Sequence, residues 1–292
     1  MRLLQSLEAL QTTADCHVIV ADNDPDRHEG FNLCSKLDGK SHRWPLKSFV
    51  VADRGLVSAR NAVIAVAFSD PTSEFVALLD DDECVEPQWL EAMLEMQAKT
   101  GADIVAGAVI PEFEKEPSPW MLKSKIYRRD EVTNGPVNTL YRAGNTLIAR
   151  KILERVPLPF FNPRYSLTGG EDLLFFAQSQ RCGVTFARAA RGRTFEFYPA
   201  SRMSFRWALL RAYRVGNNHV QVKRSLKISR FEWLLEFAKI CGAILLFPIE
   251  FITFSLSPSR RVDALCRLSR ALGKIGTLLG HNYEEYRTVH GK

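Results

Sequence analysis

Short apolar runs alternate with amphipathic stretches over the first 180 or so residues. The apolar runs predict buried strands at 16–21, 46–51, 75–79 and 104–110. Helical spacing predicts helices at 3–10, 57–68, 87–99 and 171–180. Buried strands that alternate with helices indicate an α/β fold, with a mostly parallel sheet flanked by helices.

Acidic side chains gather where two of these strands end. Asp22 and Asp24 follow the first strand, and Asp80 to Glu83 follow the third. Ligands of such sheets bind beyond the carboxyl ends of the strands. Alternate carboxylates can hold a hard divalent cation, which offsets their repulsion. The alternative is a solvated acidic turn ahead of the next helix, whose dipole favours acids.

Composition excludes several classes of protein. The 292 residues suffice for one large domain with an appendage, and 46% hydrophobic and 25% charged residues exclude a largely disordered chain. The six cysteines form no CxxC pair and lie near no histidine at ligand spacing, so neither a disulfide framework nor a zinc site is indicated.

The net charge of +6 is unevenly distributed. Residues 201–230 contain eight Lys or Arg and no Asp or Glu, which indicates an anionic partner such as phosphate, nucleic acid or an acidic membrane surface. From this change in composition we predict a catalytic domain at 1–215 and a basic and apolar helical region at 216–292.

The most apolar segment, 240–256, is flanked by basic clusters on both sides. Pro248 and Glu250 interrupt it, so it does not offer the ~20 uninterrupted apolar residues of a spanning helix. We expect a peripheral or re-entrant segment at the cytoplasmic face of the inner membrane. The alternative is a buried core helix.

Six motifs occur in a fixed order along the chain: VIVADND (18–24), RGLVSARNAVI (54–64), LLDDDE (78–83), AGNTLIAR (143–150), GGEDLLF (169–175) and SFRWALLRAYRVGN (204–217). In this order they resemble the inverting family 2 glycosyltransferases with the GT-A fold. The resemblance is closest to bacterial exopolysaccharide glycosyltransferases of the succinoglycan-biosynthesis type and covers about residues 1–220.

The resemblance implies metal-dependent transfer of one hexose from a UDP-sugar, UDP-glucose above all. The implied acceptor is a polyprenyl-diphosphate-linked saccharide, and the implied cofactor is Mg²⁺ or Mn²⁺. No nucleic-acid partner is expected, since no nucleic-acid motif accompanies the basic tract. Two alternatives stay open: a haloacid-dehalogenase-type phosphatase with Asp80 as nucleophile, and a non-catalytic membrane-bound subunit of polysaccharide assembly.

On the donor side, the resemblance implies roles for four residues. Asp22 would bind uracil, although an Asp at this point also forms turns. Arg60 would lie near the nucleotide, where a guanidinium suits phosphate; the alternative is a surface ion pair. Asp80 would contact ribose or metal, and Asp82 would ligate the metal directly.

On the acceptor side, Asp172 would be the base that takes the proton of the acceptor hydroxyl. Its neighbour Glu171 would contact the acceptor or cap its helix in a capping box with Thr168. Gly144 and Asn145 would lie near the acceptor pocket, or simply form a turn.

Some positions depart from the family pattern. Met203 stands where processive members have Gln, which favours addition of a single sugar; Arg206 would still approach the diphosphate and Trp207 the acceptor sugar. Glu196 stands where some GT-A enzymes have a histidine ligand, which leaves the third protein ligand unassigned. The family's first strand has no counterpart, so we expect a start assigned too late or a truncated copy.

Overall fold

The computed structural model describes residues 1–24, 26–37, 42–127 and 133–283. The final residues of the predicted second domain, 284–292, lie outside the described part. Contacts divide the chain into two compact units. The first comprises Met1–Ile110, Glu131–Ser166 and Glu171–Glu196, and the second Pro111–Asp130, Leu167–Gly170 and Phe197–Lys292. The predicted boundary at 215 rests on composition, not on contacts, and stays a prediction.

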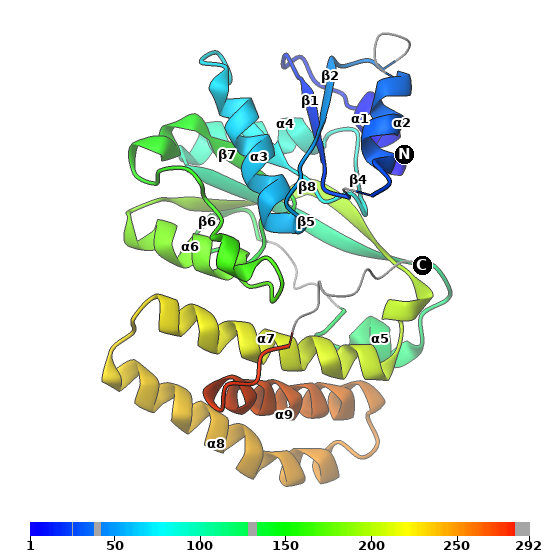
Figure 1. The fold of residues 1–292 in the computed structure, drawn as a ribbon. Coiled ribbons are helices and arrows are strands. Elements are labelled where there is room, and N and C mark those ends of the chain that lie inside the picture. Colours follow the sequence, from blue (N-terminus) through cyan, green and yellow to red (C-terminus); the bar gives the residue numbers. More distant parts are fainter. Residues whose placement is uncertain (25, 38–41, 128–132, 284–292) are drawn as a thin grey trace. The chain divides into compact units, whose positions relative to one another are not determined.

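The first unit is a layered α/β structure (Figure 1). Its helices are α1 (Arg2–Glu8), α2 (Glu29–Leu37), α3 (Leu56–Ser69), α4 (Trp89–Thr100) and α6 (Glu171–Arg181), with the short 3-10 turns η1 (Arg150–Glu154) and η2 (Pro163–Tyr165). Its strands are β1 (Val18–Asp22), β2 (Leu46–Val50), β3 (Phe75–Leu78), β4 (Glu83–Val85), β5 (Ile104–Phe113), β6 (Gly135–Val137), β7 (Thr146–Ala149) and β8 (Phe186–Tyr198). The last residues of β5 and β8 belong to the second unit.

The strands form two sheets, and the pairings in the larger one are mostly antiparallel, so the prediction of a mostly parallel sheet is wrong. β1 and β2 pair in parallel as a two-stranded sheet, and the larger sheet has the order β3-β7-β5-β8-β4 with β6 also on β8. β7 lies between β3 and β5 and is antiparallel to both, while β4 and β6 are antiparallel to β8. A strand buried on both faces, such as the fully buried β7, has the same apolar pattern in either direction, so its sequence does not reveal the direction.

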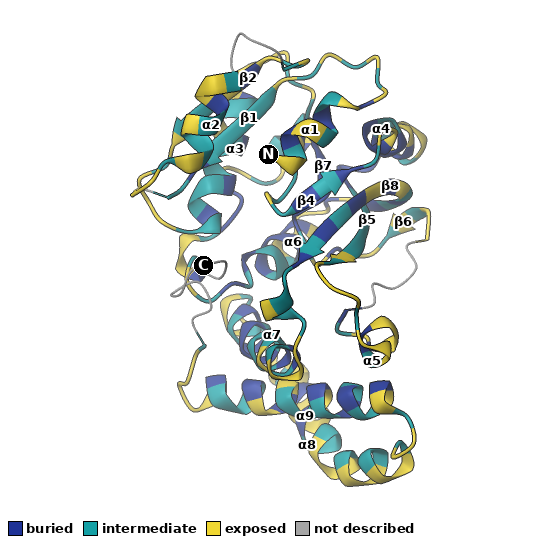
Figure 2. Ribbon diagram, turned by 90° about the vertical axis from the view of Figure 1, so that its right-hand side faces the viewer, coloured by how far each residue is buried: buried dark blue, intermediate teal, exposed yellow. Residues whose placement is uncertain are grey.

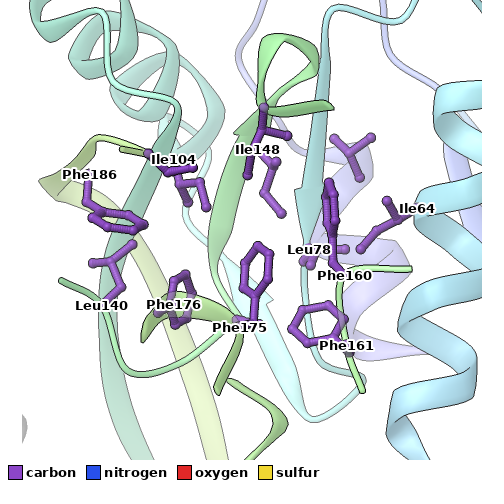
Figure 3. Packing of buried hydrophobic residues seen from close by; sticks show 14 of the residues in the cluster. Ile64, Leu78, Ile104, Leu140, Ile148, Phe160, Phe161, Phe175, Phe176 and Phe186 are labelled. Atoms are coloured by element: carbon purple, nitrogen blue, oxygen red, sulfur yellow. The ribbon is translucent and has the colours of Figure 1, made fainter. Parts of the chain in front are cut away.

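Successive residues of the larger sheet point into two separate cores. Ile104 and Ile148 belong to one core, while their neighbours Val105 and Leu147 belong to the other, as the period of two in a strand requires. Helices α3 and α6 cover the first core, in which Phe175 stacks among other aromatic rings (Figure 3). Helices α1 and α4 cover the second. Helices therefore flank the sheet on both faces, as predicted.

The second unit is helical. It contains α5 (Pro119–Lys123), η3 (Ala200–Arg202), α7 (Phe205–Ser225), α8 (Arg230–Thr253) and α9 (Pro258–Leu278). Helices α7 and α9 approach closely where each carries a glycine: a Cβ on Gly216 would lie 2.1 Å from the carbonyl oxygen of Arg270. Among the described residues, no helix is both long and apolar enough to cross a membrane.

Candidate active site

Arg60 is the centre of a buried ion-pair cluster in the first unit. Its Nη1 lies 2.7 Å from Asp172 Oδ1 and 3.2 Å from Glu171 Oε1, and its Nη2 lies 2.7 Å from Asp80 Oδ1. The surface ion pair considered for Arg60 is therefore wrong, because the side chain is only 7% exposed. We call Arg60, Asp80, Glu171 and Asp172 the carboxylate cluster.

Three elements bring the carboxylate cluster together. Arg60 projects from α3, which packs against both β1 and β3. Asp80 follows the end of β3, and the two acids of α6 occupy its first turn, where the helix dipole favours negative charge. Glu171 is the first residue of α6, so the predicted capping box, which needs it at the third position, is wrong.

The carboxylate cluster carries more negative than positive charge. Burial, and secondarily Asp172, raise the pKa of Glu171 to about 7, against the lowering effect of Arg60. Burial alone would lower the pKa of Arg60, but Asp172, Asp80 and Glu171 together raise it. Near neutral pH Glu171 is therefore partly protonated, and the cluster is suited to receive a further cation.

The loop before β7 supports two of these carboxylates. The backbone N–H of Ala143 donates to Asp172 Oδ2 at 3.1 Å. A Cβ on Gly144 would lie 2.7 Å from Asp80 Oδ2, so only glycine lets this carboxylate keep its position. Sequence reasoning missed Ala143, because a backbone donor leaves no signature in the side chain.

Asn145 has a structural part in the same loop. It is fully buried with a positive φ of 56°, and its Oδ1 accepts from Trp89 Nε1 at 2.7 Å. Its Nδ2 donates to the carbonyl oxygens of Ala108 and Gly192, each at 3.0 Å. The side chain thus joins α4, β5 and β8, which agrees with the structural alternative for this residue.

Two further buried acids, Glu83 and Glu196, lie close to the Asp80 turn. Glu83 Oε2 accepts from the Asp80 backbone N–H at 3.1 Å, and Glu83 lies opposite Glu196 in the β4–β8 pairing. Burial, together with Asp80, raises the pKa of Glu83 to about 8. Glu196 pairs with Arg142 at 3.0 Å. Glu83 is therefore mostly neutral near pH 7 and holds the Asp80 turn without adding charge.

The residues predicted to bind metal offer two carboxylates, Asp80 and Asp82. In the part of the chain that the structure describes, no three Asp, Glu, His or Cys side chains are arranged as a ready-made metal site. Mg²⁺ and Mn²⁺ suit such oxygen donors and commonly complete their coordination with substrate phosphate oxygens and water. The two residues therefore fit a cation that arrives with a diphosphate.

Asp22 ends β1, and its carboxylate is already engaged. Oδ1 accepts from the backbone N–H of Asp24 and Oδ2 from that of Phe31, both at 2.9 Å. The turn-forming alternative for Asp22 is thus what the structure contains, while the proposed contact with uracil stays a prediction.

Arg206 and Trp207 belong to the second unit. Arg206 is exposed in the first turn of α7, which Ser204 caps by accepting from the Trp207 backbone N–H. The Trp207 ring stacks on Tyr127 with centroids 5.6 Å apart and meets Tyr198 edge-on. Trp207 is therefore part of an aromatic core, and its predicted contact with an acceptor sugar stays untested.

Comparisons with known proteins identify relatives of the chain. A model described as "Glycosyl transferase family 2" matches residues 2–156. The succinoglycan biosynthesis protein ExoM of Rhizobium meliloti (strain 1021) is 29% identical over 225 residues, which cover 74% of this chain and 68% of that protein.

Solved structures are similar in fold. S. aureus TarS 1–349 in complex with UDP-GlcNAc has a TM-score of 0.51 at 14% identity, over 97% of this chain and 88% of that one. GalNAc-T7 with UDP, GalNAc and Mn²⁺ has a TM-score of 0.52 at 13% identity, over 80% of this chain and 52% of that one. At these identities the likeness concerns the fold alone.

Proposed function

The chain belongs to glycosyltransferase family 2, whose model spans more than half of it, and we propose that it transfers one hexose from a UDP-sugar to a lipid-linked saccharide. It is a transferase with the GT-A fold. The carboxylate cluster is the single observation that carries the proposal, because it joins a donor-side acid, Asp80, to an acceptor-side acid, Asp172, through Arg60.

Asp172 is proposed as the base. Its side chain is 20% exposed, so an acceptor hydroxyl can reach it. Arg60 and the Ala143 N–H each occupy one lone pair of the two oxygens, which fixes the carboxylate and leaves further lone pairs for the proton. As the acceptor oxygen attacks the anomeric carbon opposite the diphosphate, its proton passes to Asp172, and the bond from that carbon to the diphosphate breaks.

Asp80 and Asp82 are proposed to hold Mg²⁺ or Mn²⁺ together with the donor diphosphate. When bound, the cation would offset the charge that develops on the departing UDP. The structure of GalNAc-T7 contains Mn²⁺ together with UDP, which supports a metal in this fold. Gly144 leaves the space that Asp80 needs for this role.

UDP-glucose is our first candidate for the donor, and the acceptor is proposed to be a polyprenyl-diphosphate-linked saccharide at the cytoplasmic face of the inner membrane. The similarity to ExoM, a succinoglycan biosynthesis protein, supports exopolysaccharide assembly as the setting. Met203 in place of the Gln of processive enzymes supports addition of a single sugar.

The two alternatives drawn from the sequence are not favoured. A phosphatase with Asp80 as nucleophile is not favoured, because the family model that matches the chain is that of a glycosyltransferase. The match to a glycosyltransferase family supports a catalytic protein over a passive subunit.

The test is UDP release by the purified chain, measured over a panel of UDP-sugars with Mn²⁺ and a lipid extract from the membrane of an exopolysaccharide-producing bacterium. We expect release with one donor, strict dependence on extract, and loss on adding EDTA that excess Mn²⁺ restores. Asp82→Asn should raise the Mn²⁺ concentration needed for half-maximal rate, while Asp70→Asn, an exposed control, should not. Phosphate release without any donor preference would contradict the proposal.

A further inference from the structure

Helix α8 carries apolar side chains on two opposite sides. One side packs on α9 and includes the buried Ile240. The other side faces solvent (Figure 2). Its exposed residues, which we call the outer stripe, are Phe231, Leu234, Leu235, Leu245, Ile249 and Ile252.

The outer stripe is unusual for a surface helix. Leu245 is 73% exposed and Ile252 72% exposed, and both lie opposite the side that contacts α9 at helical spacing. A helix that faces water normally carries polar residues on that side. A contiguous exposed apolar strip marks an interaction site.

Basic residues border the outer stripe at both ends. Lys227 and Arg230 are exposed before and at the start of α8, and Arg260 is exposed just after it. Arg260 lies over the Phe254 ring at 5.3 Å, which keeps this cation beside the apolar surface. Residues 201–292 hold sixteen Lys or Arg against six Asp or Glu, so the whole region attracts anions.

A recess adjoins the first half of the outer stripe. It has a volume of about 390 Å³ and is lined mainly by apolar side chains, among them Trp233, Leu234 and Phe237. Two charged residues also line it: Arg230, and Glu236, whose carboxylate is paired with three lysines. An apolar recess with a guanidinium beside it suits a lipid, whose acyl chain and anionic headgroup present the same two chemistries.

We propose that the outer stripe of α8 docks on a bilayer that contains anionic phospholipid, with the helix lying in the membrane plane. The side that packs on α9 stays in the protein, the outer stripe enters the boundary between headgroups and acyl chains, and Lys227, Arg230 and Arg260 contact the headgroups. Charge complementarity favours this occupant over a second copy of the chain, since two such basic surfaces repel each other. The inference goes beyond sugar transfer and does not depend on it.

Sedimentation of the full chain with vesicles tests the proposal without donor or acceptor. We expect binding to phosphatidylcholine vesicles containing 30% phosphatidylglycerol to exceed binding to pure phosphatidylcholine by roughly tenfold or more, and to weaken as salt rises. Leu245→Gln/Ile249→Gln should reduce partitioning at least tenfold, and so should Lys227→Gln/Arg230→Gln on the anionic vesicles. All four positions are exposed or at helix ends, so circular dichroism should match the parent chain.

The matched control is Leu122→Gln/Leu167→Gln, which replaces two exposed leucines outside α8. It should bind vesicles like the parent. Equal loss in this control, or no binding by the parent, would overturn the proposal. The proposal would also be overturned if the parent chain formed a dimer that Leu245→Gln/Ile249→Gln dissociates, and did not bind vesicles. Transfer to an acceptor in detergent should survive in the α8 variants, which separates this outcome from failure of the proposed function.

Discussion

The two units contain ion-pair clusters of opposite design. In the first, one guanidinium, that of Arg60, serves three carboxylates. In the second, one buried carboxylate, that of Glu236, accepts from Lys223 at 2.7 Å, Lys274 at 2.8 Å and Lys239 at 3.0 Å. We call these four residues the lysine cluster. Arg60 and Glu236 each have three partners of opposite charge. The carboxylate cluster therefore has an excess of negative charge, and the lysine cluster has an excess of positive charge.

The difference determines how each cluster responds to acid. Burial raises the pKa of Glu171 to about 7, whereas its pKa in the unfolded chain is 4.5. Between these two pH values the folded state therefore binds a proton that the unfolded chain does not bind. Beside the lysine cluster, burial and then Lys274 lower the pKa of His219 to about 4, so the unfolded chain binds the extra proton below 6.5. Acidification from pH 7 to pH 5 should therefore strengthen the first unit and weaken the second.

The lysine cluster itself has a fixed charge around neutral pH. Burial alone would raise the pKa of Glu236, but hydrogen bonds from Lys223, Lys274 and Lys239 lower it below its usual range. Its stabilisation is present above the unfolded pKa of 4.5 and is lost only as pH falls below that value. The lysine cluster thus keeps its charge near neutral pH, whereas the carboxylate cluster changes its charge there.

The largest expected effect separates chemistry from structure. Asp172→Asn should lower kcat by about 10²–10⁴-fold with little change in donor KM, because the variant loses the proposed base and keeps the fold. Steady-state UDP release measures it. Glu236→Gln is the counterpart: it should lower stability yet leave kcat of the folded enzyme within about twofold of the parent. Equal loss of kcat in Asp172→Asn and Glu236→Gln would contradict the assignment of chemistry to the first cluster and of stability to the second.

Arg60→Gln should destabilise the protein by about 3–5 kcal/mol at pH 7.5, because it leaves three carboxylates without their cation. The loss should shrink at pH 5, where Glu171 is protonated in the fold. Urea unfolding at the two pH values measures this. Arg54→Gln, which removes an exposed ion pair with Asp26, is the control and should cost less than about 1 kcal/mol. If the loss of stability were the same at both pH values, Arg60 would not stabilise the protein by neutralising these carboxylates.

Two variants should change the pH profile of stability in opposite directions. Glu171→Gln should remove a decline of roughly 3 kcal/mol in unfolding free energy between pH 4.5 and pH 7. His219→Gln should remove a decline of about 2–3 kcal/mol as pH falls from 6.5 to 4. Differences from the parent chain, followed by urea unfolding across this range, isolate each group. Parallel curves for parent and variants would contradict the assigned shifts.

The smallest effects lie at the rim of the lysine cluster. Lys239→Gln should change stability by less than about 1 kcal/mol, because its side chain is 66% exposed. Lys274→Gln, whose side chain is only 12% exposed, should cost more. Thermal unfolding of the two variants ranks them, and a reversed order would show that burial does not set the strength of these pairs.

The local pattern of apolar residues predicted individual helices and strands, whereas tertiary contacts determine the order and direction of the strands. The helix predicted at 57–68 is α3, and the strand predicted at 75–79 is β3 within one residue, because each carries its own apolar spacing. The position of β7 between β3 and β5 depends on pairing across a long separation in sequence, which no local pattern records. The antiparallel pairings of β7 could therefore not be predicted from local pattern.

The candidate site shows the same limit. The motifs pointed to Arg60, Asp80 and Asp172 separately, and only the fold reveals that one guanidinium binds all three acids of the cluster. Of the two roles predicted for Glu171, the capping box is wrong, and the structure pairs its buried carboxylate with Arg60; contact with the acceptor stays a prediction. The roles of Met203 and Arg206 and the metal assignment to Asp82 stay predictions.

Asn145 has a consequence for genetics. It follows Gly144, which lies against Asp80. Its side chain bonds to Trp89, to Thr194 and to the backbone carbonyls of Ala108 and Gly192, and so holds the loop that carries Ala143 and Gly144. A strain with Asn145→Ala should therefore be conditional: at low temperature the polysaccharide is made, and at high temperature it is lost as the loop unfolds. A suppressor screen in such a strain should return stabilising changes far from the site and leave Asp172 untouched.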